Sequence, residues 1–387
     1  MDREADGPAI HGTVAPGFES ARRAFEENFA RAGDYQEVGA SFAAFHKGKC
    51  VVDLWGGFRD RTRTKPWKRD TLINIWSSTK GVTATAIAVL VDRGQLAYED
   101  LVTKHWPEFG ANGKEKITVA QVMSHRAGLN GFAEPTTIED MYDWNACVAK
   151  LGRQKPAWLP GTASSYHAMT YGWLAGELVR RISRKSIGAF VREEIAAPLD
   201  ADVFIGLPRS QEPRVAEMIG PKSVAPVPPL SEIAALCLVN PQQNPEAPNT
   251  RAWRAAAIPA ANGQASAMGL ARIYAALAGD GSLEGKSILS SKTIARMTTP
   301  TTNNGDRDMM LGFVDAWGMG MALNRPGIYG PNARAFGHSG WGGSFGCADP
   351  DAQLSIGYVC NQMGPDLVGD PRAAGLCNAV LAAARRN

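Results

Sequence analysis

The chain has 387 residues, of which 44% are hydrophobic and 20% are charged, a composition that excludes a small scaffold and intrinsic disorder. Its 41 basic and 38 acidic residues are interspersed and leave a formal net charge of +3, so the sequence lacks the basic stripe of a nucleic-acid-binding protein. The longest apolar stretch, 82–91, is about half as long as a membrane-spanning helix. We therefore expect neither nucleic acid nor a membrane as partner, and the acidic, Gly/Pro-rich N-terminus predicts a cytoplasmic protein.

The cysteines and histidines indicate no metal centre. The six cysteines are scattered without a Cys-x-x-Cys pair, and no His, Asp or Glu spacing is typical of zinc ligands. The sequence therefore predicts buried reduced thiols, no metal and no cofactor. It does not indicate an oligomeric state.

The N-terminal part predicts a helix, a β-hairpin and a second helix. Apolar residues recur at helical spacing in 17–32, and two strand-like segments, 38–45 and 49–55, flank Gly48. A strongly apolar helix then begins near residue 81 and ends at Gly94. Its composition predicts that it is buried.

The rest of the chain predicts helices first and strands later. Helical patterns separated by Pro-rich loops cover 118–124, 138–151, 171–182 and 187–195. After a further helix at 267–278, strands alternate with turn glycines in 335–360, and a last helix covers 372–385. We expect an α/β protein whose sheet is built from both chain ends around an inserted all-helical lobe. The expected divisions are 1–98 and 256–387 for the α/β lobe and 99–255 for the helical lobe.

A Ser-x-x-Lys sequence, Ser77 to Lys80, lies at the predicted start of the apolar helix. Three residues apart on a helix, the two side chains share one face, and the helix N-terminus favours developing negative charge. A serine nucleophile activated by a lysine needs this arrangement. The spacing is common by chance, so its meaning depends on the residues that accompany it.

Two later segments accompany this pair, namely Ser164-Ser165-Tyr166-His167-Ala168 and Gly337-His338-Ser339-Gly340-Trp341-Gly342-Gly343. In this combination and order the sequence resembles the serine β-lactamase and penicillin-binding-protein superfamily, and within it the family VIII carboxylesterases. The resemblance covers nearly the whole chain and includes segments 14–19, 122–129 and 166–172. It implies a β-lactamase/transpeptidase-like fold with a central antiparallel sheet.

The resemblance also implies roles for individual residues. Ser77 would attack an acyl carbonyl and become acylated, while Lys80 and Tyr166 would move protons. The backbone N–H groups of Ser77 and Trp341 would form the oxyanion hole. Free lysine and tyrosine side chains titrate near pH 10, so a base among them needs a pKa lowered by about two to three units. The sequence does not decide which of the two is that base.

Two departures from the lactamase pattern favour a neutral ester as the small-molecule substrate. The Tyr motif ends in Ala168 where lactamases carry Asn, and the late triplet begins with His338, largely neutral near pH 7, where they carry Lys. The residues expected to contact substrate are Trp76, Ala168, His338, Ser339, Gly340 and Trp341. The aromatic residues predicted to line an acyl pocket are Trp76, Trp158, Trp341 and Phe345.

We therefore predict a serine carboxylesterase that hydrolyses short-chain esters through an acyl-Ser77 intermediate, with weak β-lactamase side activity. A β-lactamase or D-amino-acid peptidase on the same fold is one alternative, against which the missing Asn and Lys argue. A non-catalytic binding protein is another, against which the presence of Ser77, Lys80 and Tyr166 argues.

A rival nucleophile is Ser344, in a Gly-x-Ser-x-Gly sequence typical of α/β-hydrolases. That fold needs a later histidine, and none follows His338. We interpret Ser344 as a structural residue among turn glycines, His125 as one that holds a loop, and Trp317-Gly318-Met319-Gly320 as a strand that packs behind the site.

Overall fold

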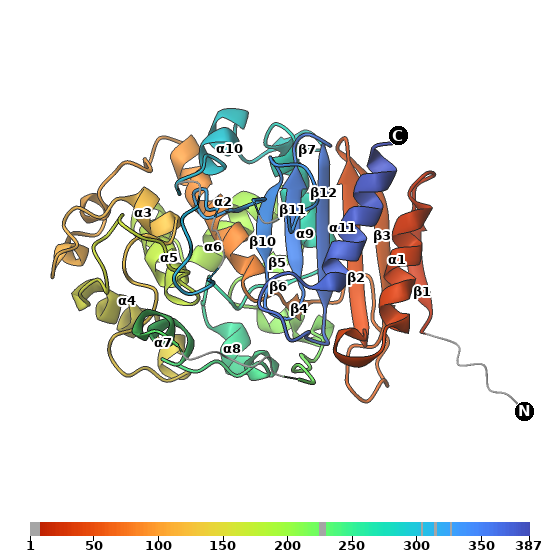
Figure 1. The fold of residues 1–387 in the computed structure, drawn as a ribbon, viewed down its shortest axis with the longest axis horizontal. Coiled ribbons are helices and arrows are strands. Elements are labelled where there is room, and N and C mark those ends of the chain that lie inside the picture. The colour runs from red at the N-terminus through yellow and green to blue at the C-terminus, as the bar shows by residue number, and fades with distance from the viewer. Residues whose placement is uncertain (1–7, 224–229, 303–304, 313–315, 326) are drawn as a thin grey trace, which may run out of the picture.

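The computed structural model describes residues 8–223, 230–302, 305–312, 316–325 and 327–387. Among these residues, seven strands form one antiparallel sheet in the order β1-β3-β2-β12-β11-β10-β9. The strands are β1 (Ile10–Val14), β2 (Gly39–His46), β3 (Lys49–Gly57), β9 (Ala322–Leu323), β10 (Phe336–Ser339), β11 (Phe345–Asp349) and β12 (Leu354–Cys360). Both chain ends supply strands to the sheet, as predicted (Figure 1).

Helices cover both faces of this sheet. α1 (Glu19–Ala30) and α11 (Pro371–Ala384) lie together on one face, and α9 (Ala267–Ala278) packs against β2, β11 and β12 on the other (Figure 1). Because its two faces are covered, β2 is buried along its whole length. The turn that joins β2 to β3 consists of Lys47 and Gly48, both with positive φ, as a two-residue hairpin turn requires.

Further helices and short strands form the rest of the described fold. The helices are α3 (Val119–Met123), α4 (Trp144–Arg153), α5 (Thr170–Ser183), α6 (Ile187–Val191), α7 (Glu232–Leu238), α8 (Arg251–Ala255) and α10 (Ser291–Met297). A small sheet contains β4 (Ile73–Asn74), β6 (Gln264–Ala265) and β5 (Val203–Phe204), and β7 (Ser282–Leu283) pairs with β8 (Lys286–Ser287).

The apolar helix predicted after residue 81 is α2 (Ser78–Asp92), which lies between the large sheet and the helical region. It packs against β10 and β11 on one side and against α5 and α6 on the other. All of its residues from Ser78 to Leu90 are buried, as predicted, which explains why the helix has no polar face. Gly94, with φ of +66°, follows its C-terminal end.

Three local expectations were wrong. The helix expected to begin at residue 138 begins at Trp144, because the Asp143 side chain caps it by accepting from the Ala146 N–H at 3.0 Å. The strand expected at 317–320 is absent there, and Trp317 makes a single bridge to Ala322. Cys50 is exposed because it lies beside the hairpin turn at the open end of β3.

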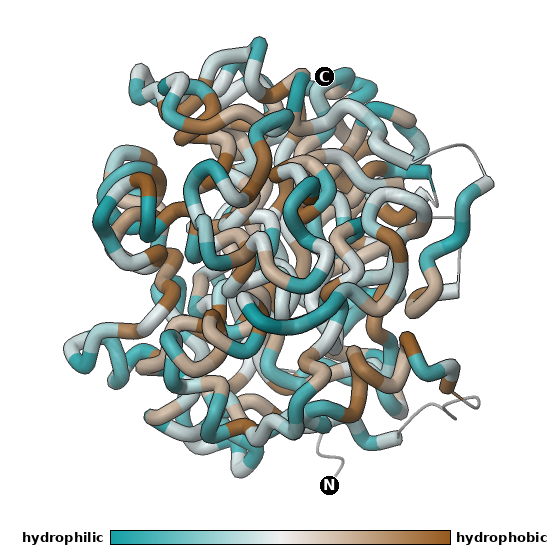
Figure 2. Tube along the Cα trace, turned by 90° about the vertical axis from the view of Figure 1, so that its left-hand side faces the viewer, coloured by the Kyte–Doolittle hydropathy of each residue, from teal (hydrophilic) through white to brown (hydrophobic). Residues whose placement is uncertain are grey.

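Figure 2 views the molecule from the helical side and shows short hydrophobic stretches broken by hydrophilic ones along the described trace. Within the described residues, none of the helices combines the length and the apolar character needed to cross a membrane.

Candidate active site

Ser77 lies where the chain leaves the small sheet and enters α2. The residue before it, Trp76, has φ of +43°, a left-handed conformation that residues with a side chain rarely adopt. Within 71–90, all of which the structure describes, Ser77 is the one residue that is not buried. The bend therefore presents a single serine at the edge of an otherwise buried segment.

Lys80 lies one helical turn after Ser77 and points back at it. Its Nζ is 3.0 Å from the Ser77 Oγ, and it also donates to the carbonyl oxygens of Ala168 at 2.6 Å and Ala260 at 3.0 Å. Burial lowers the pKa of Lys80 to about 7, because the charged form loses its hydration. Near neutral pH a large fraction of Lys80 is therefore an uncharged amine able to accept a proton.

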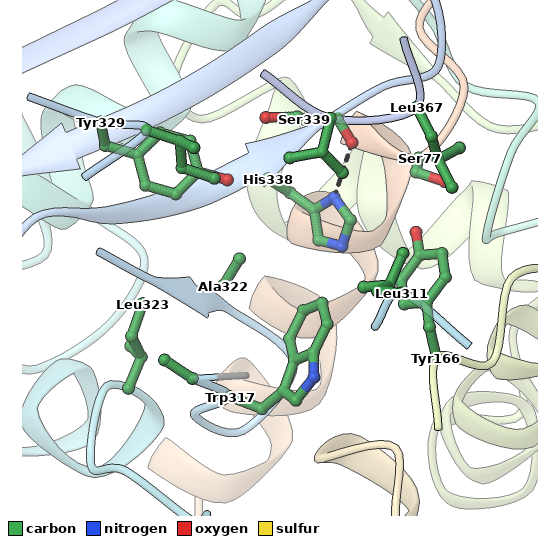
Figure 3. Close-up of a pocket in the computed structure, with 13 residues that line it drawn as sticks. Ser77, Tyr166, Leu311, Trp317, Ala322, Leu323, Tyr329, His338, Ser339 and Leu367 are labelled. Atoms are coloured by element: carbon green, nitrogen blue, oxygen red, sulfur yellow. Dashed lines mark hydrogen bonds between the residues drawn. The ribbon is translucent and has the colours of Figure 1, made fainter. Parts of the chain in front are cut away.

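Tyr166 faces Ser77 from the loop before α5, with its hydroxyl directed at the serine (Figure 3). Its ring stacks on Trp317 with centroids 5.7 Å apart, and the Lys80 Nζ is 4.7 Å from its centroid. Burial raises the pKa of Tyr166 above its ordinary value, and the Ser77 hydroxyl opposes this rise only in part. At neutral pH Tyr166 is thus a phenol, and the lowered pKa belongs to Lys80.

The two backbone N–H groups expected to form the oxyanion hole are those of Ser77 and Trp341. Over the described residues, neither the Ser77 N–H nor the Trp341 N–H donates to a protein acceptor. The segments that carry them are in contact, since a Cβ on Gly340 would lie only 2.2 Å from the Ile75 carbonyl oxygen. Glycine is therefore required at position 340 for the two segments to approach each other this closely.

A buried ion cluster supports the turn that contains Trp341. Arg372 is fully buried and donates from Nη2 to the Gly342 carbonyl oxygen at 2.8 Å. It also pairs with Asp370 at 2.7 Å and with Glu37 at 3.4 Å. Burial raises the pKa of Glu37 to about 8, although Arg372 opposes the rise. Sequence patterns did not reveal this cluster, because its carboxylates come from opposite ends of the chain.

A narrow cavity with a volume of about 40 Å³ opens beside Ser77 and Tyr166 (Figure 3). Its walls are largely apolar, and the described residues that line it are Ser77, Tyr166, Leu311, Ala316, Trp317, Ala322, Leu323, Ile328, Tyr329, His338, Ser339, Leu367 and Val368. Sequence reasoning missed most of these walls. They come from β9 and from described residues outside helices and strands, such as Leu311, Tyr329 and Leu367, and no periodic pattern or chemical motif in the sequence indicated them.

His338 supplies a neutral polar group to this cavity. Its Nδ1 is 2.9 Å from the Ser339 carbonyl oxygen, so Nδ1 carries the proton that makes this hydrogen bond. Burial lowers the pKa of His338 to about 3, with the charge of Lys80 as a further cause, in agreement with the expected neutral side chain. Its buried Nε2 has no protein partner among the described residues and remains an acceptor.

Several residues that were predicted to contact the substrate do not line this cavity. Ala168 contributes its carbonyl oxygen to Lys80 rather than a side chain to the cavity. The Trp76 ring packs against Trp253 and Trp341, with centroids 5.4 and 5.1 Å away. None of the four aromatic residues expected in an acyl pocket is among the described residues that line this cavity, and Phe345 packs in the core on the α11 side of the sheet.

The two histidines near the tyrosine hold loops together, as expected for His125. The Nδ1 of His125 accepts from the backbone N–H of His167 at 3.1 Å, and the Nε2 of His167 accepts from the Leu129 N–H at 3.2 Å. Burial lowers the pKa of both imidazoles, so each is neutral and able to accept. Their hydrogen bonds fix the loop that carries Tyr166.

Ser344 does not have the surroundings of a nucleophile. It is buried, it donates its hydroxyl proton to the Ile75 carbonyl oxygen at 2.9 Å, and it is followed by strand β11. A hydrolase elbow would place a helix there.

Comparison with known proteins shows which family the chain resembles. The sequence model of the family described as Beta-lactamase matches residues 22–378. The chain is 36% identical to the esterase/beta-lactamase LipL of Mycobacterium tuberculosis (strain ATCC 25618 / H37Rv), over 94% of this chain and 86% of that protein.

Solved structures show the same fold. A crystal structure of a family VIII carboxylesterase is 45% identical, with a TM-score of 0.92 over 97% of this chain and 100% of the other. A penicillin-binding-protein homologue from Caulobacter crescentus is 42% identical, with the same TM-score and coverage. With the family match extending over most of its length, this chain belongs to the Beta-lactamase family.

Proposed function

We propose that the protein is a serine carboxylesterase that hydrolyses neutral, short-chain carboxylic esters through an acyl-Ser77 intermediate. The observation that carries this proposal is a buried lysine whose pKa is lowered to about 7 and whose Nζ is 3.0 Å from the one accessible serine of the 71–90 segment. A nucleophile and a base within hydrogen-bond distance are the minimum machinery of acyl transfer.

The contacts of Lys80 support its role as the base in acylation. A neutral amine has two N–H groups, which the carbonyl oxygens of Ala168 and Ala260 occupy, and its lone pair then faces the Ser77 hydroxyl. As Ser77 attacks the ester carbonyl, its proton passes to the Lys80 Nζ and the Oγ–C bond forms. The carbonyl oxygen becomes an oxyanion that the N–H groups of Ser77 and Trp341 stabilise.

Tyr166 completes the proton transfers. Because it is a phenol at neutral pH, it donates its proton to the departing alkoxide as the ester C–O bond breaks, and it regains a proton from Lys80. Lys80 is then neutral again. In deacylation a water attacks the acyl carbon, its proton follows the reverse route, and Ser77 leaves with a proton restored.

The cavity supports a small, uncharged substrate. Its apolar walls favour a hydrocarbon group, and a volume of about 40 Å³ is roughly the room that three ordered waters fill. The neutral His338 provides an acceptor but no cation for a substrate carboxylate. Ala168 provides no side-chain amide for an acyl-amide substituent.

The names of the relatives support esterase activity and also indicate β-lactamase activity as a second candidate. A family VIII carboxylesterase and an esterase/beta-lactamase are both similar over most of this chain. Since one of these names includes both activities, a weak β-lactamase reaction at the same serine is the second candidate. A peptidase acting on D-amino acids is less favoured, because it would need a cation for the substrate carboxylate.

The test compares hydrolysis of p-nitrophenyl butyrate and of nitrocefin by the protein and by Ser77→Ala. We expect ester turnover to exceed nitrocefin turnover, and both to fall by about a thousandfold or more in the variant, because the nucleophile is lost. Stoichiometric labelling of the protein, but not of Ser77→Ala, by a fluorophosphonate would exclude a non-catalytic binding protein.

Ser355→Ala is the matched control for this test. Ser355 is a fully buried serine in β12 whose hydroxyl donates to the Ala271 carbonyl oxygen, and it has no contact with the cavity. Its removal should leave both activities unchanged. Dominant nitrocefin turnover would contradict the ester preference, and activity that survives in Ser77→Ala would contradict the mechanism.

A further inference from the structure

We propose that Ser344 is a positioning residue that, together with Ser78, holds the two arms of the oxyanion hole at a fixed separation. The serine arm is defined as residues 75–78 and carries the Ser77 N–H, and the tryptophan arm is defined as residues 338–344 and carries the Trp341 N–H. The inference rests on the proposed acyl transfer at Ser77 and assigns to Ser344 a role that its Gly-x-Ser-x-Gly sequence does not indicate.

The first observation is the contact made by the Ser344 hydroxyl. The side chain is 4% exposed, and its Oγ donates to the Ile75 carbonyl oxygen at 2.9 Å. Ile75 lies two residues before Ser77 on the serine arm. The bond therefore ties the base of the tryptophan arm directly to the bend that presents Ser77.

The second observation is a contact in the opposite direction. Ser78, fully buried at the start of α2, places its Oγ 3.1 Å from the Ser344 carbonyl oxygen and 3.2 Å from the His338 carbonyl oxygen. The Ser344 carbonyl oxygen also accepts from the Gly340 N–H at 2.7 Å, which closes the turn around Trp341. One hydroxyl from each arm thus binds a backbone carbonyl of the other.

The third observation is that the main chains do not make this connection themselves. Within the described ranges, no backbone-to-backbone hydrogen bond joins 75–78 to 338–344. The arms are nevertheless in van der Waals contact, since a Cβ on Gly340 would lie 2.2 Å from the Ile75 oxygen and 2.3 Å from the Ser344 Oγ. Besides this packing and the contact between the Trp76 and Trp341 rings, the hydrogen bonds of the two serine hydroxyls are therefore the polar connections that set the spacing between the arms.

This spacing matters because an oxyanion hole works only when both donors reach the same oxygen. Donors are effective about 2.7–3.1 Å from the oxyanion, and a shift of roughly 1 Å can cost a hundredfold in rate. Loss of the Ser344 hydroxyl should lower the stabilisation of the tetrahedral intermediate, while the cavity that binds the ester keeps its walls. The effect should fall on kcat rather than on KM.

The experiment measures p-nitrophenyl butyrate hydrolysis by Ser344→Ala, Ser78→Ala and the double variant, with thermal unfolding of each. We expect kcat to fall by about ten- to a hundredfold in each single variant, with KM within about twofold of the parent, because the oxyanion contact is made in the transition state. The double variant should lose less than the product of the single losses, because both hydroxyls serve one contact. The pH midpoint of kcat/KM should stay where Lys80 sets it.

Ser355→Ala removes the same hydroxyl group from a buried serine of β12, and its kcat should match that of the parent protein. An unchanged kcat in folded Ser344→Ala and Ser78→Ala, or an equal loss in Ser355→Ala, would overturn the inference. So would a shift of the pH midpoint, since that would place the effect on the proton transfers. Activity that survives in Ser77→Ala would contradict the proposed function itself. The Ser344→Ala and Ser78→Ala variants test only the positioning role, so the two failures can be told apart.

Discussion

A lysine in water carries its proton until about pH 10, and Lys80 illustrates how a folded environment changes this. Its ammonium is enclosed in the protein, where three oxygen atoms accept from it, and no carboxylate of the described residues is paired with it. Hydrogen bonds to carbonyl oxygens replace part of the lost hydration without supplying negative charge. The pKa therefore falls to about 7, and Lys80 can serve as a base at physiological pH.

This lowered pKa predicts how the activity depends on pH. Because the neutral form of Lys80 is the active one, kcat/KM for p-nitrophenyl butyrate should be low in acid, rise as the pH passes through about 7, and then reach a plateau. Initial rates across a pH series check this. Lys80→Arg keeps a cation that does not deprotonate, so its kcat should fall by about a hundredfold or more and show no midpoint near 7. A variant with the parent's profile would contradict the assignment.

At the scale of elements, the turn between β10 and β11 depends on the start of α11. Arg372 lies at the first turn of that helix and is held by Asp370, which also caps the helix by accepting from the Arg372 backbone N–H at 2.8 Å. The guanidinium then donates to the Gly342 carbonyl oxygen and to the Gln362 carbonyl oxygen. A buried cation thus joins a helix start, a strand end and the turn of the active site.

Arg372→Met should therefore destabilise the protein strongly. The substitution leaves the Asp370 carboxylate buried without its cation and removes a partner of the Glu37 side chain, so the free energy of unfolding should fall by about 3 to 5 kcal/mol. Urea unfolding measures the change. Arg334→Met is the control, because Arg334 is 72% exposed in its pair with Asp351 and its loss should cost less than about 1 kcal/mol. If the two substitutions lowered the free energy of unfolding equally, burial of the Arg372 cluster would not explain its contribution to stability.

At the scale of the whole molecule, α2 joins the sheet to the helical region. One continuous cluster of buried residues extends from Ala43 and Phe45 on the sheet, through α2, to Leu151 on α4 and Leu178 on α5. Ser77 and Lys80, the proposed nucleophile and base, lie at the N-terminal start of the helix that both regions share. Neither region can lose its packing on α2 without disturbing the position of Ser77.

We expect the sheet and the helical region to unfold together. Ile87→Ala, a truncation at a fully buried position of α2, should lower the free energy of unfolding by about 2 to 5 kcal/mol while keeping a single transition. Calorimetry and urea unfolding followed by circular dichroism and by tryptophan fluorescence check this. A variant that shows two separated transitions would mean that the two regions fold independently.

Local sequence patterns were enough to predict several helices and strands and the contact between Ser77 and Lys80. Periodicity and turn residues located α2, α9 and the β2–β3 hairpin, because these patterns reflect hydrogen bonds between residues close in the chain. The Ser77–Lys80 contact was predictable for the same reason, since helical spacing alone places the two side chains together. The resemblance of the tyrosine and glycine segments to a known family added the expected fold and the type of reaction.

Features that depend on contacts between distant segments could be read from the three-dimensional fold but not from the sequence. Burial decided that Lys80 rather than Tyr166 has the lowered pKa, and desolvation cannot be read from spacing. The described walls of the cavity come from segments far apart in the chain, and the Arg372 cluster joins residues more than three hundred positions apart. Ser344 resembled a nucleophile in sequence, yet its hydroxyl donates to Ile75 across the active site. A local pattern fixes local geometry, whereas the charge state and the partners of a side chain depend on which distant residues the fold places around it.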